Sequence, residues 1–321
     1  MRLLVSCILS VILLSAAARP HSLRRYGIPP GHYSGITPLG DDRYAVVSDK
    51  EPRSGFFLWT IRLNPKNGKV EEVRNEGFRG DEKPADRDAE GIAWCPQRKT
   101  VFISGEADQR ILEHALDGTP TGRELPVPPK YGTDRILSNR GFEALCYDSL
   151  RQVFWTCLES SAEDASESVS LLRFPLSTLS SSRQNSDAVS EVASYPLTPA
   201  QARPGWRDHY HGVVALTPLA DGSLLVLERE ARITHSGSGS RCWVKLFRHQ
   251  PATGQKMQLA EWKSRFNPLN TRFANYEGMC LGPVLRDGTR TLFLISDSQG
   301  GYGRGPWHLK DMLRVFRLPK E

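Results

Sequence analysis

Short apolar runs with alternating hydrophobic and polar positions are separated by turn residues along the whole chain, and helical periodicity is weak throughout. This pattern is typical of an all-β protein. One phrase returns five times: a polar residue, called the opener below, is followed by Gly or Ala and then by an apolar run. The copies cover residues 33–39, 89–95, 142–148, 210–216 and 276–282, and consecutive openers are 53 to 68 residues apart. A repeat of this length built from short strands predicts one β unit stacked along a line or around a ring.

Each repeat predicts four strands. The opening phrase is the first strand, and a β-rich second run follows a turn, at 44–48, 100–104, 153–158, 223–228 and 291–296. Alternating third runs lie at 57–63, 111–116, 170–174, 244–248 and 313–318, and most lead through a tight turn into a fourth. Four-stranded repeats of this kind are typical of β-propeller blades. We therefore predict an all-β propeller of five four-stranded blades, with six as the alternative if an insertion contains a degenerate blade.

The last repeat ends after its third strand, close to the final Pro319-Lys-Glu. A propeller can fill the missing place with a strand from the other terminus, and residues 22–28 fit that role because they precede the first opener. Closure by this strand would pair an exposed sheet edge and bring the two ends of the chain together. No linker divides the chain, so residues 19–321 are predicted to form a single domain.

Residues 1–18 have a positively charged start, an apolar stretch and small residues at the end, which predicts an export signal cleaved near Ala18. A membrane anchor is the alternative, but the stretch is short, and no later run reaches the ~18 apolar residues of a spanning helix. The mature protein is expected to be periplasmic or secreted. Five cysteines remain after cleavage, and none forms a Cys-x-x-Cys pair. They are interpreted as small buried hydrophobic residues rather than as zinc ligands.

The formal net charge is +6, and the basic residues are scattered without a dense run. A nucleic-acid partner is therefore not expected. The chain also contains neither a Gly-x-Ser-x-Gly elbow nor a P-loop, which disfavours an α/β serine hydrolase and a P-loop NTPase. We expect a monomer that acts on or binds a small molecule.

Ring closure would bring the openers together, because the first strand of every propeller blade lines the central channel. The openers are Ser34, Glu90, Glu143, His211 and Glu277. Carboxylates that converge on a narrow axis repel one another unless a proton or a cation neutralises them, and flexible oxygen coordination suits Ca²⁺ best. The openers therefore predict a calcium site in which Ser34 assists the three glutamates and His211 holds a water or a ligand oxygen. The alternative is that the openers cap strand ends with hydrogen bonds.

The second strands end on the same face, and Asp49 and Asp297 occupy matching positions one circuit apart. Each of them could extend the metal site, act as a general base that activates a water, or close a turn. Arg229 at the end of a second strand and Arg140 beside an opener supply the forked donors that bind phosphate or carboxylate. These residues favour a small anionic or phosphorylated substrate, and the alternative is that the arginines only pair with the acidic rings.

Five phrases carry a resemblance to a known family: Asp88-Ala-Glu-Gly-Ile-Ala93, Asn139-Arg-Gly-Phe-Glu-Ala144, Leu225-Val-Leu-Glu-Arg229, Asn275-Tyr-Glu-Gly278 and Leu294-Ile-Ser-Asp297. Their order and number resemble the phytase-like propeller family, which is described as having esterase-like activity of phytase. The resemblance extends from about Tyr33 to Leu318 and implies an exported propeller that hydrolyses a phosphoester or an ester. The opener series also resembles the axial calcium site of five-bladed calcium-activated nucleotidases, which have a second serine where this chain has His211.

The leading expectation is a calcium-dependent hydrolase of a phosphoester or a related ester. Asp49 or Asp297 would orient the attacking water, and Arg229, Arg140 and His211 would meet the developing anion. Two other functions stay open: a non-catalytic, calcium-stabilised propeller that binds a ligand or a protein, and a lactonase of the propeller type.

Overall fold

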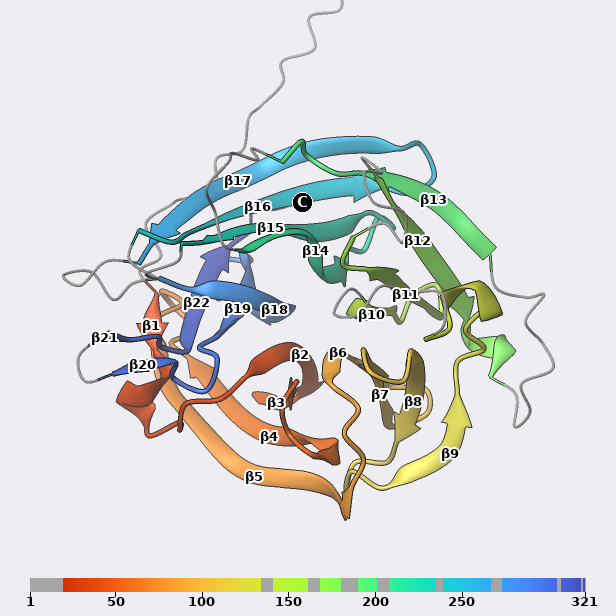
Figure 1. Ribbon diagram of the computed structural model, residues 1–321, viewed down its shortest axis with the longest axis horizontal. Helices are drawn as coiled ribbons and strands as arrows, with labels where there is room; N and C mark the ends of the chain where they lie inside the picture. Colours follow the sequence, from red (N-terminus) through yellow and green to blue (C-terminus); the bar gives the residue numbers. More distant parts are fainter. Residues whose placement is uncertain are drawn as a thin grey trace, which may run out of the picture.

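The structure is a computed structural model that describes residues 20–133, 141–160, 168–179, 190–200, 208–234, 239–266, 273–304, 307–318 and 320. Five four-stranded antiparallel sheets surround a central channel, as Figure 1 shows. The predicted five-bladed all-β propeller is confirmed. In the described part of the chain, no helix is long and apolar enough to cross a membrane. The predicted export signal and Arg140 lie outside the described residues.

Each blade is an antiparallel meander whose first strand faces the channel. Blade 1 contains β2 (Tyr33–Gly40), β3 (Arg43–Ser48), β4 (Arg53–Leu63) and β5 (Val70–Pro84), and blade 2 contains β6 (Ala89–Cys95), β7 (Thr100–Gly105), β8 (Arg110–His114) and β9 (Pro120–Glu124). Blade 3 contains β10 (Phe142–Asp148), β11 (Val153–Leu158), β12 (Ser168–Pro175) and β13 (Ser190–Pro196). Blade 4 contains β14 (Asp208–Pro218), β15 (Leu224–Ile233), β16 (Arg241–Gln250) and β17 (Gln255–Arg265).

Blade 5 is closed by the N-terminal segment, as predicted. Its strand order is β18 (Asn275–Val284), β19 (Arg290–Asp297), β22 (Met312–Arg317) and β1 (His21–Ser22). The closing strand is shorter than predicted, because a 3₁₀ helix, η1 (Leu23–Tyr26), follows β1 at once and ends at Gly27 with φ of 77°. The Leu23 N–H still bonds the Asp311 carbonyl oxygen, at 2.9 Å. The ring is therefore held by a short ladder and by the burial of Leu23.

Three other short elements lie between strands. The 3₁₀ helix η2 (Pro129–Tyr131) joins blades 2 and 3, the 3₁₀ helix η3 (Leu176–Thr178) joins β12 to β13 in blade 3, and a two-stranded ribbon of β20 (Gly303–Arg304) and β21 (Trp307–His308) lies between β19 and β22 of blade 5. The ribbon follows the glycine-rich segment that begins at Gly300. Gln299 and Tyr302 from this region line the cavity described below.

The hydrophobic core is divided into five clusters, one between each pair of neighbouring blades. Leu23, Trp59 and Phe293 are fully buried in the cluster that joins blade 1 to blade 5. The five cysteines among the described residues are buried and unpaired, as expected. Each sheet has apolar residues on both of its faces, because every blade packs against two neighbours, and this explains the division.

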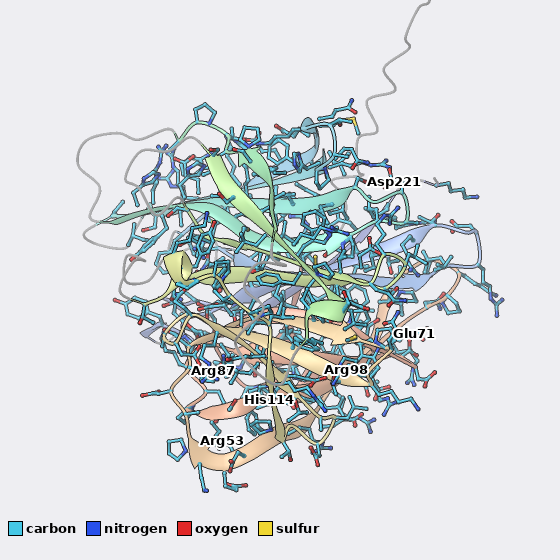
Figure 2. The ribbon with its side chains drawn as sticks, turned by 90° about the vertical axis from the view of Figure 1, so that its right-hand side faces the viewer. Arg53, Glu71, Arg87, Arg98, His114 and Asp221 are labelled. Atoms are coloured by element: carbon cyan, nitrogen blue, oxygen red, sulfur yellow. The ribbon has the colours of Figure 1, made fainter. Side chains whose placement is uncertain are left out.

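Buried polar contacts also join blades 1 and 2, on the side seen in Figure 2. His114 Nε2 lies 2.8 Å from Ser54 Oγ, and both residues are buried. Burial lowers the pKa of His114 to about 4, so this imidazole is neutral at physiological pH. A neighbouring pair, Arg98 and the fully buried Glu113, is completed by Thr100 and Thr121. We interpret these contacts as structural, because the Ser54–His114 pair is sealed between two blades.

Candidate functional site

Two cavities open at opposite ends of the channel, and they differ in chemistry. The larger, of about 670 Å³, lies where the first strands end. The smaller, of about 360 Å³, lies where the first strands begin and the second strands end. It is strongly acidic, because five of its lining residues carry a carboxyl group: Asp49, Glu90, Glu106, Glu143 and Glu277. We call it the acidic cavity.

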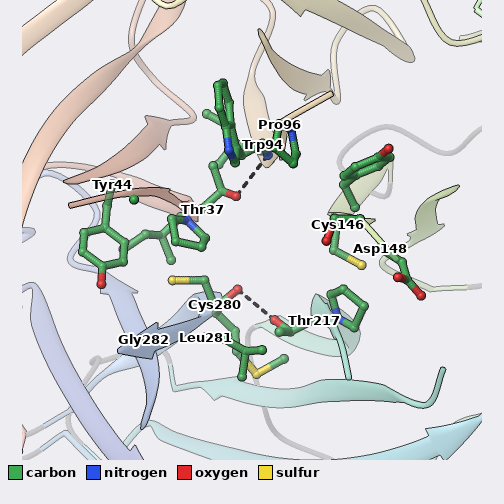
Figure 3. A pocket seen from close by; sticks show the side chains of 18 of the residues that line it. Thr37, Tyr44, Trp94, Pro96, Cys146, Asp148, Thr217, Cys280, Leu281 and Gly282 are labelled. Atoms are coloured by element: carbon green, nitrogen blue, oxygen red, sulfur yellow. Dashed lines mark hydrogen bonds between the residues drawn. The ribbon is translucent and has the colours of Figure 1, made fainter. Parts of the chain in front are cut away.

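Several polar groups that line the larger cavity are already bonded within the protein (Figure 3). The Thr37 hydroxyl accepts a hydrogen bond from the Trp94 N–H at 3.1 Å, and the Thr217 hydroxyl donates to the Met279 carbonyl at 3.1 Å. Asp148 is paired with Arg151 at 3.0 Å. The polar groups named here are therefore already satisfied, and the acidic cavity is the stronger candidate for chemistry.

A β-bulge aims four openers at the axis. In blades 1, 3 and 5 the extra residue of the inner strand is the opener itself, and in blade 2 the irregularity covers the opener and the next glycine. An extra residue in one strand breaks the alternation of side chains and redirects the bulged residue. Ser34, Glu90, Glu143 and Glu277 consequently line one narrow waist of the channel. The structure thus brings together the four residues predicted to form the metal site.

Blade 4 departs from this pattern. Its bulge lies between Val213 and Ala215, so the extra residue is Val214, and Val214 lines the waist. His211 stays in regular register opposite Glu230, stacks on His209 and lines neither the acidic cavity nor the waist. Burial lowers the pKa of His211. The expectation that His211 belongs to the axial ring therefore needs correction, because the sequence shows the repeated phrase but not the position of the bulge.

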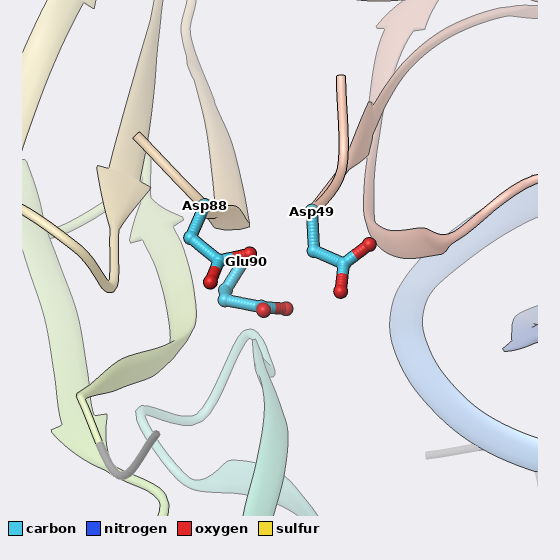
Figure 4. Close-up of side chains that lie close together, drawn as sticks. All are labelled: Asp49, Asp88 and Glu90. Atoms are coloured by element: carbon cyan, nitrogen blue, oxygen red, sulfur yellow. The ribbon is translucent and has the colours of Figure 1, made fainter. Parts of the chain in front are cut away.

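The carboxyl groups of the acidic cavity form two close groups that share Glu90. Oxygens of Glu90, Glu106 and Glu143 lie within 4.8 Å of one another, and the same holds for Asp49, Asp88 and Glu90 (Figure 4). Among the described residues, none donates a hydrogen bond to the carboxylates of Glu90 or Glu143, whereas Glu106 accepts one from the Gly141 N–H at 2.7 Å. Glu90, Glu106 and Glu143 are all buried. Glu90 and Glu143 are therefore buried carboxyl groups without a hydrogen-bond donor among the described residues, and Arg229 only partly offsets the charge of Glu143.

The electrostatics of the site follow from this arrangement. Burial, with the neighbouring Glu143 and Glu277, raises the pKa of Glu90 well above its usual value. Burial and Glu159 do the same for the pKa of Glu143. Burial also raises the pKa of Glu106, against the opposing effect of the Gly141 N–H. Each raised pKa means that the ionised form of that carboxyl group is unfavourable unless a cation is added.

Arg229, which extends from β15, bridges three blades. It donates to Glu159 and Glu277 and, at 3.2 Å, to the Asn275 side-chain oxygen. The pairing of an arginine with the acidic residues, one of the two interpretations of the sequence, is therefore present. Arg229 also lines the cavity, and its Nε has no hydrogen-bond partner in the described part of the chain.

Asp49 and Asp297 both approach the same nitrogen of one imidazole. His32 Nδ1 is 3.5 Å from Asp49 Oδ1 and 3.7 Å from Asp297 Oδ1. Asp49 lines the cavity, but Asp297 does not, and the N–H of Gln299 binds Asp297 at 2.6 Å. Burial raises the pKa of both carboxyl groups. Of the two predicted bases, only Asp49 can contact a ligand in the cavity.

The donor set determines which cation fits. Glu90, Glu106 and Glu143 present only oxygen, and their carboxylates are close enough to share one ion. Hard divalent cations prefer such ligands, and Ca²⁺ tolerates their irregular geometry better than Mg²⁺. In the second group Lys50 Nζ already lies 2.7 Å from Asp88 and 3.3 Å from Asp49. The residues present therefore fit a calcium ion between Glu90, Glu106 and Glu143.

The raised pKa values predict how stability depends on pH in the chelated protein. Burial raises the pKa of Glu277 from 4.5 to about 7 even though Arg229 lowers it. Between these values the folded chain binds more protons than the unfolded chain, so the free energy of unfolding falls as pH rises. We expect a loss on the order of 3 kcal/mol from Glu277 alone. Denaturant titrations between pH 5 and about 7.5 in chelator measure this slope; a slope of zero or of the opposite sign would count against the proposed burial of charge.

The sequence of this chain matches a known family over most of its length. The family is described as "Phytase-like: Esterase-like activity of phytase", and the match covers residues 28–299. The chain belongs to the phytase-like family. The resemblance expected from the short Glu-Gly and Ser-Asp phrases is thereby confirmed. No curated protein matches this phytase-like chain.

Solved structures with similar chains include a streptogramin B lyase, at 13% identity and a TM-score of 0.40, covering 94% of this chain and 97% of the lyase. A gluconolactonase from Xanthomonas campestris is 12% identical with a TM-score of 0.44, covering 97% and 93%. The periplasmic gluconolactonase of Pseudomonas aeruginosa is 14% identical with a TM-score of 0.38, covering 90% and 74%. At these values the likenesses say nothing about the activity of this phytase-like protein.

Sequence reasoning assigned no individual role to three residues of the site: His32, Asp88 and Glu106. Glu106 carries a usable signal, because it stands at the end of the second strand of its repeat, as Asp49 does in the first. His32 and Asp88 precede openers by only two residues, and their neighbourhood of aromatic and basic residues marks them weakly. The unusual backbone of Asp88, with φ of 53°, has no sequence signature.

Proposed function

We propose that this phytase-like protein is an exported, calcium-dependent hydrolase that cleaves a phosphoester or a related ester in the acidic cavity. One observation carries the proposal. Glu90, Glu106 and Glu143 converge from two blades, all three are buried, and among the described residues only the Gly141 N–H donates a hydrogen bond to any of them. Carboxylates assembled in this way cost stability, and such a cost is typical of functional sites.

Glu90, Glu106 and Glu143 would hold the ion. When bound, a calcium ion supplies positive charge that polarises the substrate oxygen. The waist below the site is only about 10 Å³ and is closed by apolar side chains such as Ile92, Leu145 and Met279. Substrate and water would therefore enter and leave only through the outer opening of the acidic cavity.

Asp49 is the best placed proton acceptor. Its carboxyl group lines the cavity, and burial raises its pKa, which makes it a better base than an ordinary aspartate. The carboxylate would take a proton from the attacking water as the water oxygen bonds to the ester centre. His32 Nδ1, 3.5 Å from Asp49 Oδ1, would fix the orientation of that carboxylate. Asp297, which approaches the same nitrogen of His32, would act as a positioning residue.

Arg229 would stabilise the negative charge that develops on the substrate. Two of its nitrogens are held by Glu159 and Glu277, which fixes the plane of the guanidinium group. The free Nε–H would meet the developing oxyanion, which needs a donor that is already oriented. Arg140, predicted to take part in the same role, stays a prediction.

The competing function is a propeller whose calcium only stabilises the fold and whose face binds a ligand or a protein. The purified chain from residue 19 separates the two when it is tested on phosphomonoesters, phosphodiesters, carboxylic esters and lactones, with calcium and with chelator. We expect turnover that falls at least about 100-fold in chelator and returns with calcium. Stabilisation by calcium without turnover of any substrate would support the binding protein instead.

A further inference from the structure

The acidic cavity has two different walls. The carboxyl side is built by blades 1, 2, 3 and 5, through the residues named above. The opposite wall belongs to blade 4 and the segments next to it, and apart from Arg229 and Ser240 its members are apolar or aromatic: Tyr210, Ala231, Ile233, Phe266, Phe273 and Leu309. The axial residue of blade 4 is also apolar, since Val214 stands where the other blades place a polar opener. The bulge that removes His211 from the axis thus places an apolar side chain at the waist, next to the acidic cavity.

The cationic side chains of the cavity already form ion pairs. Among the described residues that line the cavity, Lys50 and Arg229 are the only two cationic residues, whereas five lining residues carry a carboxyl group. Lys50 pairs with Asp49 and Asp88, and Arg229 pairs with Glu159 and Glu277. One divalent ion would offset part of the remaining negative charge but not reverse it. A phosphate dianion would therefore enter an unfavourable field, whereas an uncharged ester would not.

We infer that the substrate is an uncharged carboxylic ester with a bulky apolar group, which packs on the wall formed by Tyr210, Ile233 and their neighbours. This inference rests on the proposed function for the chemical step, but the apolar wall itself does not depend on it. The ester carbonyl would lie toward Glu90, Glu143 and Arg229, and the apolar group would lie on the blade 4 side. Water adds to the carbonyl carbon, the bond from that carbon to the alcohol oxygen breaks, and the alcohol leaves with a proton as the acid is released.

Length of the apolar group is the variable to test. We propose measuring kcat/KM for 4-nitrophenyl acetate, butyrate and hexanoate, and for 4-nitrophenyl phosphate, in calcium buffer. Each added methylene that reaches the wall is expected to raise kcat/KM roughly fourfold until the cavity is full. The phosphate should be at least about 100-fold poorer than the hexanoate.

Two substitutions in the wall test the placement. Ile233→Ser and Tyr210→Ser change partly exposed side chains, so the fold should tolerate them. Each is expected to flatten the dependence on chain length, because kcat/KM for the hexanoate falls more than kcat/KM for the acetate. Leu150→Ser is the matched control, because Leu150 is an exposed apolar residue at the other end of the channel.

A binding measurement keeps the inference testable apart from turnover. N-phenylhexanamide resembles the hexanoate ester but carries an amide, and its affinity can be measured by calorimetry with and without chelator. Binding that weakens about tenfold or more in Ile233→Ser supports the apolar wall, even if no ester is cleaved and the hydrolase proposal fails. Absence of binding would overturn the inference. The inference would also be overturned if 4-nitrophenyl phosphate were cleaved faster than the hexanoate. That result would leave the hydrolase proposal standing.

Discussion

Glu143→Gln is expected to abolish the response of this protein to calcium while leaving the calcium-free fold at least as stable as before. Burial and Glu159 raise the pKa of Glu143, so its ionised form costs stability in the absence of a cation. Glutamine removes that charge in nearly the same volume. In calcium at about 100 times its dissociation constant, the unmodified protein should gain about 2.7 kcal/mol of unfolding free energy, and the variant should gain almost none.

Turnover should fall by at least about 100-fold in the same variant, because the ion that polarises the substrate is lost. Glu228→Gln is the matched control. Glu228 is equally buried, but it bonds Tyr195 and Lys256 outside the acidic cavity. It should lose stability in calcium and in chelator alike, and it should keep the calcium response. If Glu143→Gln were strongly destabilised in chelator, Glu143 would be a structural cap and not a ligand.

Leu23→Ala is expected to lower the unfolding free energy by about 2–5 kcal/mol, the usual cost of emptying a fully buried leucine site. Leu23 is completely buried between blades 1 and 5, where it packs in the same cluster as Trp59 and Phe293. It also follows the two-residue strand that completes the last blade. A chain that begins at Pro29 lacks this whole segment and should lose more stability than the point variant.

Arg25→Ala is the control for the closing segment, since Arg25 belongs to the same 3₁₀ helix but is exposed. It should change the unfolding free energy by less than about 0.5 kcal/mol. Chemical denaturation of the three chains measures the difference. A Leu23→Ala protein as stable as Arg25→Ala would mean that the N-terminal segment does not hold the ring closed.

The fold could be predicted because the sequence repeats itself. Every blade needs alternating apolar residues and turn residues, so the five phrases and their following runs identify the strands directly. Closure could be predicted as well, because the last repeat is one strand short. The detail of the closing segment could not: residues 23–26 form a 3₁₀ helix where an extended strand of residues 22–28 was expected. Leu23 is fully buried in this segment, and its burial is a property of the assembled ring that the local sequence does not show.

The site could be predicted only in part. Ser34, Glu90, Glu143 and Glu277 meet at the waist because their openers coincide with a bulge. His211 carries the same phrase, yet the bulge of blade 4 falls on Val214. The position of a bulge depends on how the strands pair in the assembled blade, and the repeated phrase alone does not reveal it.

The most direct test of the calcium site is a crystal structure of the protein grown with calcium, with anomalous diffraction data collected at long wavelength. The account predicts an anomalous peak between Glu90, Glu106 and Glu143, with carboxylate oxygens at ~2.3–2.6 Å from it. A map without a peak at this position, or with the ion bound only beside Asp49 and Asp88, would contradict the account.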